Sequence, residues 1–193
     1  MPENLHKLFV ISSPSGGGKT SLINKLFEDS RSANFEKSIS DTSRQKRQGD
    51  LEGKDYYFLS EKDFKDKINK EEYVEYATVF GNFYGTSKEE IKTKYNNSNL
   101  ILELDWQGAY AVKELFDDAK LIFLVPPSLD DLKQRLIKRN LDSSKEIESR
   151  LSEAKKEISK SEMYDYLVLN DDFHKAFEDP VSYTHLRAHE TRL

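Results

Sequence analysis

The sequence contains no cysteine, which excludes a disulfide framework and any metal site built on thiolates. It also lacks long apolar runs. The longest are Leu8–Ile11 and Leu121–Val125, far short of the ~20 residues that a membrane span needs. The opening residues Met-Pro-Glu-Asn have no apolar segment of the kind found in a signal peptide. We therefore expect a cytoplasmic chain without a membrane partner.

An excess of charge of one sign is also missing. Charged residues make up 34% of the 193 positions, yet the net charge is only -5. This mildly acidic balance disfavours a nucleic-acid partner, because nucleic-acid-binding domains are usually basic. Hydrophobic residues make up 36%, enough for a thin core. At ~100–200 residues per domain, the length indicates one domain with room for sub-lobes. Composition leaves the function and the oligomeric state open.

Short apolar segments alternate with helical ones along most of the chain. We expect strands at Lys7–Ser12, Leu100–Asp105, Leu121–Val125 and Tyr166–Leu169, and helices at Lys19–Phe27, Gly108–Phe116, Leu129–Arg139 and Lys145–Ile158. Ser60 and Ser128 each precede an acidic residue by three positions, a pattern typical of a helix start. Apolar strands separated by helices predict an α/β fold, a parallel sheet with helices on both faces. Residues 38–95 break this alternation and indicate an inserted lobe.

A glycine-rich turn joins the first expected strand to the first helix. Residues 13–20 fit the phosphate-loop (P-loop) pattern G-x-x-x-x-G-K-[ST], with serine in place of the first glycine. In such loops backbone N–H groups face phosphate oxygens, the lysine reaches the β- and γ-phosphates, and the hydroxyl binds Mg²⁺. We predict that ATP binds at Ser13, Pro14, Ser15, Gly16, Gly17, Gly18, Lys19 and Thr20. The alternative, an ordinary glycine-rich turn, is disfavoured by the position of Gly-Lys-Thr between strand and helix.

Two carboxylates close the second apolar strand. Glu103 and Asp105 are two positions apart, so we expect both side chains on one face of the strand. A carboxylate in an apolar strand is unfavourable without a purpose, and a phosphate-loop site uses an acidic residue from a neighbouring strand to hold the metal. We predict Mg²⁺ at Thr20 and Asp105. For either carboxylate, a solvated residue at the strand end is the alternative.

Several separate motifs together resemble the guanylate kinases, P-loop enzymes that phosphorylate GMP with ATP. Besides the phosphate loop they are Ser38-Ile-Ser-Asp-Thr-Ser-Arg44, Gly53-Lys-Asp-Tyr-Tyr-Phe58, Gly81-Asn-Phe-Tyr-Gly85, Asp105-Trp-Gln-Gly108 and Asn170-Asp-Asp172. The resemblance covers about residues 8–176. It implies transfer of the γ-phosphoryl group of ATP to GMP or dGMP, giving ADP and GDP, in purine nucleotide metabolism. It also implies a P-loop NTPase sheet in one domain over residues 1–180, with a core at 1–37, 96–128 and 160–180, a GMP-binding lobe at 38–95 and a helical lid at 129–159.

The resemblance further implies residues that bind GMP. The residues that contact guanine are Ser40, Glu75 and Thr86, with help from Glu103 or Asp105. The phosphate is held by Arg44, Arg47, Tyr56 and Tyr84. The chemistry agrees, because one carboxylate accepts from both N1–H and the 2-amino group of guanine, whereas adenine leaves it unpaired. A guanidinium donates to phosphate through two prongs. Without the resemblance, Glu75 is a surface charge and residues 44–47 form a solvated basic turn. Gln45, Lys46 and Gln48 stand where the family often has prolines, so we expect a more mobile loop.

Arginines in the expected lid carry the transfer step under the same resemblance. Arg135, Arg139 and Arg150 neutralise the transferring phosphoryl group together with Lys19 and Arg44, and Asn170 contacts the adenine side. On pattern alone, the lid is a solvated helix pair with many charges. Two other functions stay open: a guanylate-kinase-like binding module without catalysis, and a P-loop kinase for another small acceptor such as a sugar phosphate. An intact Gly-Lys-Thr disfavours the first, and the guanine-reading set disfavours the second.

The last residues, Val181–Leu193, have neither a helical nor a strand period. His185 and His189 are spaced to form half a metal site on a helix, but no third ligand accompanies them. We expect this segment to be a read-through tail that is not part of the natural protein. In that case the family's closing helix is missing, and the chain is less stable than a version that carries it.

Overall fold

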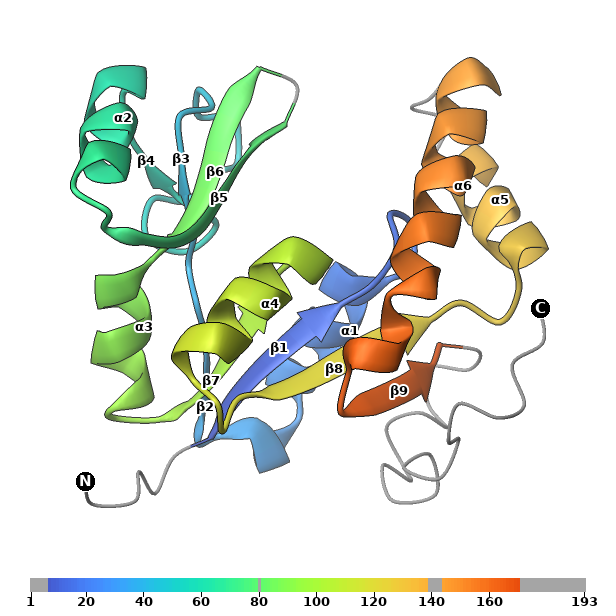
Figure 1. The fold of residues 1–193 in the computed structure, drawn as a ribbon, viewed down its shortest axis with the longest axis horizontal. Helices are drawn as coiled ribbons and strands as arrows, with labels where there is room; N and C mark the ends of the chain where they lie inside the picture. The colour runs from blue at the N-terminus through green and yellow to red at the C-terminus, as the bar shows by residue number, and fades with distance from the viewer. Residues whose placement is uncertain (1–6, 80, 139–143, 171–193) are drawn as a thin grey trace. The chain divides into compact units, whose positions relative to one another are not determined.

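The computed structural model of the chain describes residues 7–79, 81–138 and 144–170 (Figure 1). Its strands are β1 (Leu8–Ser12), β2 (Phe35–Lys37), β3 (Asp41–Thr42), β4 (Tyr57–Phe58), β5 (Tyr73–Val79), β6 (Asn82–Ser87), β7 (Asn99–Glu103), β8 (Lys120–Val125) and β9 (Tyr166–Leu169). Its α-helices are α1 (Lys19–Glu28), α2 (Glu61–Asn69), α3 (Lys88–Tyr95), α4 (Trp106–Leu115), α5 (Leu129–Lys138) and α6 (Ser144–Ser159), and short 3-10 turns cover Ser30–Ser32 and Ser161–Met163.

The strands of the described residues form two sheets, which confirms the expected α/β class. A five-stranded sheet has the order β2-β7-β1-β8-β9, and a four-stranded sheet has the order β4-β3-β6-β5. In the larger sheet, β2 pairs with β7 and β8 pairs with β9, both in parallel. Its strands are mostly buried, as their apolar runs predict: Leu8, Val10, Leu100, Leu102 and Phe123 are at most 1% exposed.

Two expectations about the larger sheet were wrong. The second parallel strand along the chain is β2, which sequence analysis missed because it spans three residues with one apolar side chain, Phe35. The strand expected at Leu100–Asp105 ends at Glu103, so Asp105 lies beyond the strand and does not share a strand face with Glu103. Asp105 instead caps α4, because its carboxylate accepts the N–H of Gly108 at 2.9 Å. That cap starts α4 at Trp106, two residues before the expected start.

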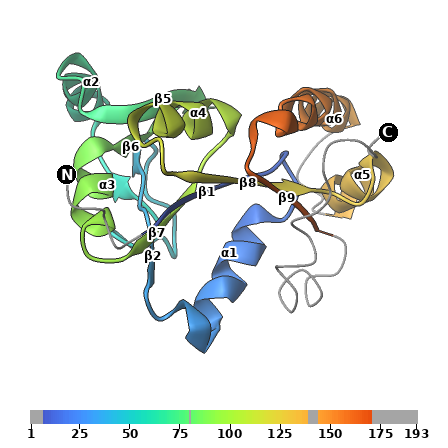
Figure 2. The same cartoon turned by 60° about the horizontal axis from the view of Figure 1, so that its bottom comes forward.

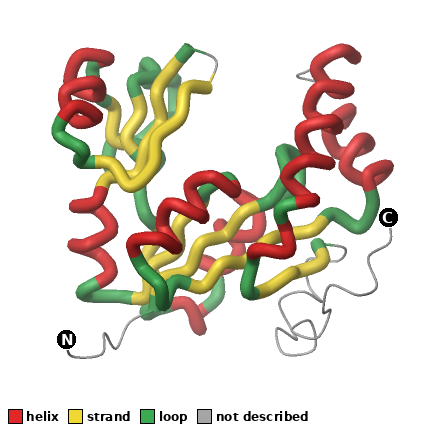
Figure 3. Tube along the Cα trace, in the orientation of Figure 1, coloured by secondary structure: helices red, strands yellow, loops and turns green. Residues whose placement is uncertain are grey.

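The chain divides into two compact units, one of residues 1–10 and 34–119 and one of residues 11–33 and 120–193. In the first unit, the four-stranded sheet packs against α2 (Figure 3). Phe64 of α2 is fully buried, and its ring stacks on Tyr73 at 4.6 Å and on Phe83 at 5.3 Å between centroids. Ser60 begins α2 as the sequence predicts, since its hydroxyl accepts the N–H of Asp63 at 3.0 Å.

In the second unit, α5 and α6 lie side by side (Figure 2). Ser128 begins α5 as predicted, because its Oγ accepts the N–H of Asp131 at 3.0 Å. Leu132 and Leu136 of α5 are fully buried. They pack on Gly16, where a Cβ would stand 2.9 Å from a methyl group of Leu136. The glycine-rich turn is therefore part of the packed core of this unit.

Candidate active site

The turn between β1 and α1 has the backbone that a phosphate loop requires. Gly16 and Gly18 have φ angles of 87° and 90°, in the left-handed region that favours glycine. The N–H of Gly17 donates to the carbonyl of Pro14 at 2.8 Å, which closes the turn. Ser13, which stands where the motif has its first glycine, is buried and has no positive φ. The serine therefore fits this position without backbone strain.

No side chain caps the start of α1. Its N-cap residue is Gly18, which offers no acceptor, whereas Ser60, Ser87 and Asp105 each accept an N–H of the first turn of α2, α3 and α4. The N–H groups of a helix's first turn have no partner within the helix, and they carry the positive end of its dipole. The start of α1, at Lys19, is therefore suited to an anion such as a phosphate group.

Three side chains from later in the sequence secure this loop. Arg150 donates from NH1 to the hydroxyl of Ser15 at 3.1 Å. The amide Nδ2 of Asn170, a buried residue, donates to the carbonyl of Gly17 at 2.5 Å. Arg135 in turn donates from NH2 to the carbonyl of Asn170 at 2.9 Å. Two arginines that the sequence assigned to the lid thus contact the loop or its anchor.

Glu75 and Thr86 form a hydrogen-bonded pair on neighbouring strands of the first unit. The two residues face each other in the register of β5 and β6, and the hydroxyl of Thr86 donates to Oε1 of Glu75 at 2.6 Å. Thr86 is buried and Glu75 is half-buried. Gly108 of α4 leaves room for this carboxylate, because a Cβ there would stand 3.0 Å from Cγ of Glu75. The motif at residues 105–108 therefore packs against the acid predicted to read guanine.

Aromatic rings surround Arg44. Its guanidinium carbon lies 5.4 Å from the ring centres of both Tyr56 and Phe58, and its side chain is only 10% exposed. The ring of Tyr84 meets that of Tyr56 edge-on at 5.7 Å. Burial raises the pKa of the Tyr56 hydroxyl, with smaller contributions from Tyr84 and Glu103. Three of the four predicted phosphate-binding residues are thus gathered here, and the raised pKa of Tyr56 keeps its hydroxyl protonated as a donor.

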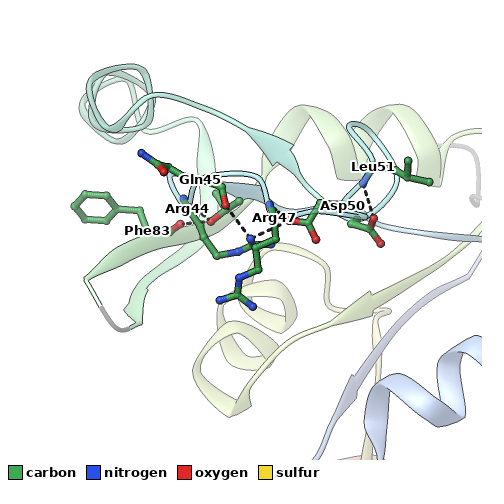
Figure 4. A network of polar contacts seen from close by, with 8 residues as sticks. Arg44, Gln45, Arg47, Asp50, Leu51 and Phe83 are labelled. Carbon is green, nitrogen blue, oxygen red and sulfur yellow. Dashed lines mark hydrogen bonds and ion pairs between the residues drawn. The ribbon is translucent and has the colours of Figure 1, made fainter. Parts of the chain in front are cut away.

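Asp50 is a residue of this site that the sequence analysis missed. Its Oδ2 lies 2.9 Å from NH1 of Arg44 and accepts the backbone N–H of Arg47 at 2.7 Å (Figure 4). These contacts lower the pKa of Asp50, chiefly through the N–H of Arg47 and then through Arg44, and they raise the pKa of Arg44. The side chain of Arg47 is exposed. The only sequence signal for Asp50 was a carboxylate close to two arginines.

The other predicted GMP residues occupy varied environments. Ser40 is half-buried just before β3, and its carbonyl accepts the N–H of Tyr57 at 3.0 Å. Glu103 pairs with Nζ of Lys37 at 2.7 Å, a partner that the sequence did not suggest. Asp105 is exposed at the start of α4. Arg139 and the histidines of the tail lie outside the described residues.

Among the described residues, no group of three or more histidine, aspartate or glutamate side chains could hold a metal ion by itself. In nucleotide sites Mg²⁺ binds through one or two protein oxygens together with phosphates and water. Thr20 and Asp105 each offer an oxygen donor of the kind that Mg²⁺ prefers. In the part of the chain that the structure covers, no helix has the length and apolar content to cross a membrane.

The chain is similar to known proteins over most of its length. A family model for guanylate kinase matches residues 5–183. A guanylate kinase of Wolbachia sp. subsp. Brugia malayi is 45% identical over 179 residues, 92% of this chain and 91% of that protein. One of Hahella chejuensis is 46% identical over 188 residues, 97% of this chain and 88% of that protein. The crystal structure of guanylate kinase from Anaplasma phagocytophilum superposes with a TM-score of 0.70 at 35% identity, covering 93% of this chain and 84% of that one. The chain belongs to the guanylate kinase family.

Proposed function

We propose that the chain transfers the γ-phosphoryl group of ATP to GMP, or to dGMP, and releases ADP and GDP. The observation that supports GMP as the acceptor is the hydrogen-bonded pair of Glu75 and Thr86 on neighbouring strands. Gly108 packs against the side chain of Glu75. Membership of the guanylate kinase family supports the reaction class. GMP binds to residues 38–95, and ATP binds to the phosphate loop under the lid at residues 129–159.

Glu75 selects guanine over adenine. Its carboxylate accepts from N1–H and the 2-amino group of guanine, while hydroxyls of Ser40 and Thr86 serve the remaining polar edge. Adenine presents an acceptor at N1 and no 2-amino group, so the half-buried carboxylate beside Thr86 would face no donor on the base. A buried mismatch of this kind can discriminate by about 10⁴–10⁵-fold. Glu103 or Asp105 assists in reading the base.

The GMP phosphate is held by two charged and two neutral donors. Arg44 and Arg47 supply guanidinium forks, which match the geometry of phosphate oxygens. Tyr56 and Tyr84 add hydroxyl donors without further charge, and the raised pKa of Tyr56 keeps its proton in place. The site therefore attracts the phosphate and orients one of its oxygens toward the γ-phosphorus of ATP.

Transfer proceeds in line, without a covalent enzyme intermediate. A GMP phosphate oxygen forms a bond to the γ-phosphorus while the bond to the β–γ bridging oxygen breaks, and that oxygen leaves with ADP. Charge spreads over the transferring group, so positioned cations supply most of the acceleration. These cations are Lys19, Arg44, Arg135, Arg139 and Arg150. A well-placed arginine can contribute about 10³-fold or more.

Thr20 and Asp105 would hold Mg²⁺ together with the nucleotide phosphates. Both are oxygen donors, and the carboxylate of Asp105 is exposed although Oδ1 already accepts the N–H of Gly108. When bound, Mg²⁺ neutralises charge on the phosphoryl oxygens. The loop N–H groups and Lys19 bind and orient the same phosphates.

An assay of ADP release with GMP, dGMP, AMP, CMP and UMP as acceptors tests the proposal. We expect turnover with GMP and dGMP, and at least about 10⁴-fold lower kcat/KM with AMP. Equal activity with AMP and GMP would refute the assignment of Glu75. In the same assay with a sugar phosphate as the acceptor, a preference for that acceptor over GMP would favour a different small-molecule kinase. ATP binding without turnover on any acceptor would favour a binding module.

A further inference from the structure

One turn of the loop between β3 and β4 is closed by the carboxylate of Asp50. Oδ2 of Asp50 accepts the N–H of Arg47 at 2.7 Å, and the N–H of Asp50 donates back to the carbonyl of Arg47 at 3.1 Å. Gly49, with φ of 95°, makes the tight turn that brings these groups together. The carboxylate and the backbone thus lock residues 47–50 in both directions (Figure 4).

The same Oδ2 also holds the guanidinium of Arg44 at 2.9 Å. NH1 of Arg44 makes this contact and also donates to the carbonyl of Gln45 at 2.9 Å. A guanidinium has five N–H donors in a fixed plane, so two contacts at NH1 and two flanking rings determine where the others point. A phosphate that approaches Nε or NH2 of Arg44 need not displace Asp50.

These contacts link both arginines of the GMP phosphate site to one side chain. We propose that Asp50 is a positioning residue that preorganises Arg44 and the turn of Arg47 for the phosphate of GMP. The inference rests on the proposed function. Preorganisation strengthens GMP binding through entropy. An arginine that is not held in place loses the rotamer freedom of its long side chain when it binds the phosphate, and an unconstrained loop loses backbone freedom as well. The opposite role, competition with the phosphate for Arg44, would follow if the carboxylate occupied the phosphate position.

A matched control lies in the next turn of the same loop. Oδ2 of Asp55 accepts the N–H of Leu51 at 2.7 Å, and the N–H of Asp55 donates to the carbonyl of Leu51 at 3.0 Å. Asp55 therefore closes a turn as Asp50 does, but within the described part of the chain it makes no ion pair with an arginine. Asp55→Ala removes a turn-closing carboxylate whose hydrogen bonds are to Leu51 and not to Arg44 or Arg47.

The test measures calorimetric binding of GMP and of guanosine, which lacks the phosphate, to the full chain and its variants. In Asp50→Ala we expect GMP affinity to fall about tenfold or more, which is the size of losing one charge-assisted hydrogen bond, with guanosine affinity unchanged. Asp50→Asn keeps an acceptor for the Arg47 N–H but loses the charge, so its GMP affinity should fall less than that of Asp50→Ala. Asp55→Ala should bind both ligands normally. In kinetics, the KM for GMP should rise while the KM for ATP stays constant.

The possible outcomes distinguish failure of the proposed function from failure of the positioning role of Asp50. If the original chain binds GMP no more tightly than guanosine, the proposed function fails and this inference fails with it. If the original chain prefers GMP and Asp50→Ala keeps that preference, only the positioning role is refuted. A gain in GMP affinity would refute it too and show that Asp50 competes with the phosphate. An equal loss for GMP and guanosine, or the same loss in Asp55→Ala, would show a general structural effect instead.

Discussion

Replacing Gly108 by alanine should weaken GMP binding while the protein stays folded. Gly108 has no positive φ, so alanine can adopt its backbone conformation. The new Cβ would stand 3.0 Å from Cγ of Glu75 and 3.2 Å from Cβ of Leu104, closer than ordinary van der Waals contact. Because Glu75 is a flexible side chain, the chain relieves this contact by moving Cγ a few tenths of an ångström. The carboxylate predicted to read guanine moves with it.

The magnitudes separate function from stability. Alanine favours a helix over glycine by about 1 kcal/mol, whereas overpacking costs about 1–3 kcal/mol, so we expect a net destabilisation of about 0–2 kcal/mol. A misplacement of 1 Å at a site can cost about 10²-fold in rate, so a shift of about half that should lower kcat/KM for GMP about tenfold. The KM for ATP should not change.

Steady-state kinetics and thermal unfolding of Gly108→Ala measure these two effects. Glu114→Ala, an exposed position on the same helix, serves as a control with normal kinetics. In a Glu75→Gln background the effect of Gly108→Ala should shrink, because both changes act on one carboxylate. A kcat/KM for GMP within about twofold of the original chain would refute the reasoning, and so would additive effects of the two substitutions.

Three further predictions concern the phosphate loop and the buried hydroxyl of the lobe. Lys19→Ala should abolish turnover while the protein stays folded, and retained ADP release would contradict the role of the loop lysine. Asn170→Ala removes the donor to the carbonyl of Gly17, so the affinity for ATP should fall about tenfold with GMP affinity unchanged, as calorimetry can measure. Burial and a hydrogen bond to Asp41 raise the pKa of Tyr73, so this hydroxyl stabilises the fold below its unfolded pKa of about 10 and the contribution is lost as pH rises further. Urea unfolding of Tyr73→Phe should therefore show a weaker loss of stability above pH ~10, and an unchanged pH profile would exclude the hydroxyl as its source.

Features carried by neighbouring residues were predictable from sequence. The strand at Tyr166–Leu169 and the start of α1 at Lys19 match the expectation. Ser60 and Ser128 begin helices where their acidic partners three positions on indicated, because a cap is a contact within one turn. The phosphate loop is local in the same sense, since its glycines set its backbone angles directly.

Features that depend on distant partners were not predictable. The edge strand β2 has too few apolar residues to signal itself, and it forms because β7 offers a ladder of backbone partners. Asp105 was placed on a strand face, but a strand end and a helix cap look alike in sequence until the first turn of α4 forms around the carboxylate. The ion pair that makes Asp50 part of the site depends on how its loop folds.

By itself, then, the sequence determined the α/β class, the phosphate loop and, through joint motifs, the guanylate kinase family, because each of these is encoded in short patterns of residues. Only the tertiary structure decided which residues hold the site in shape. Asn170 reaches Gly17 across 153 positions and Arg150 reaches Ser15 across 135. Such contacts depend on how whole helices and strands pack. The need for glycine at position 108 also depends on packing, because Glu75 of the neighbouring strand β5 occupies the space that a Cβ would fill.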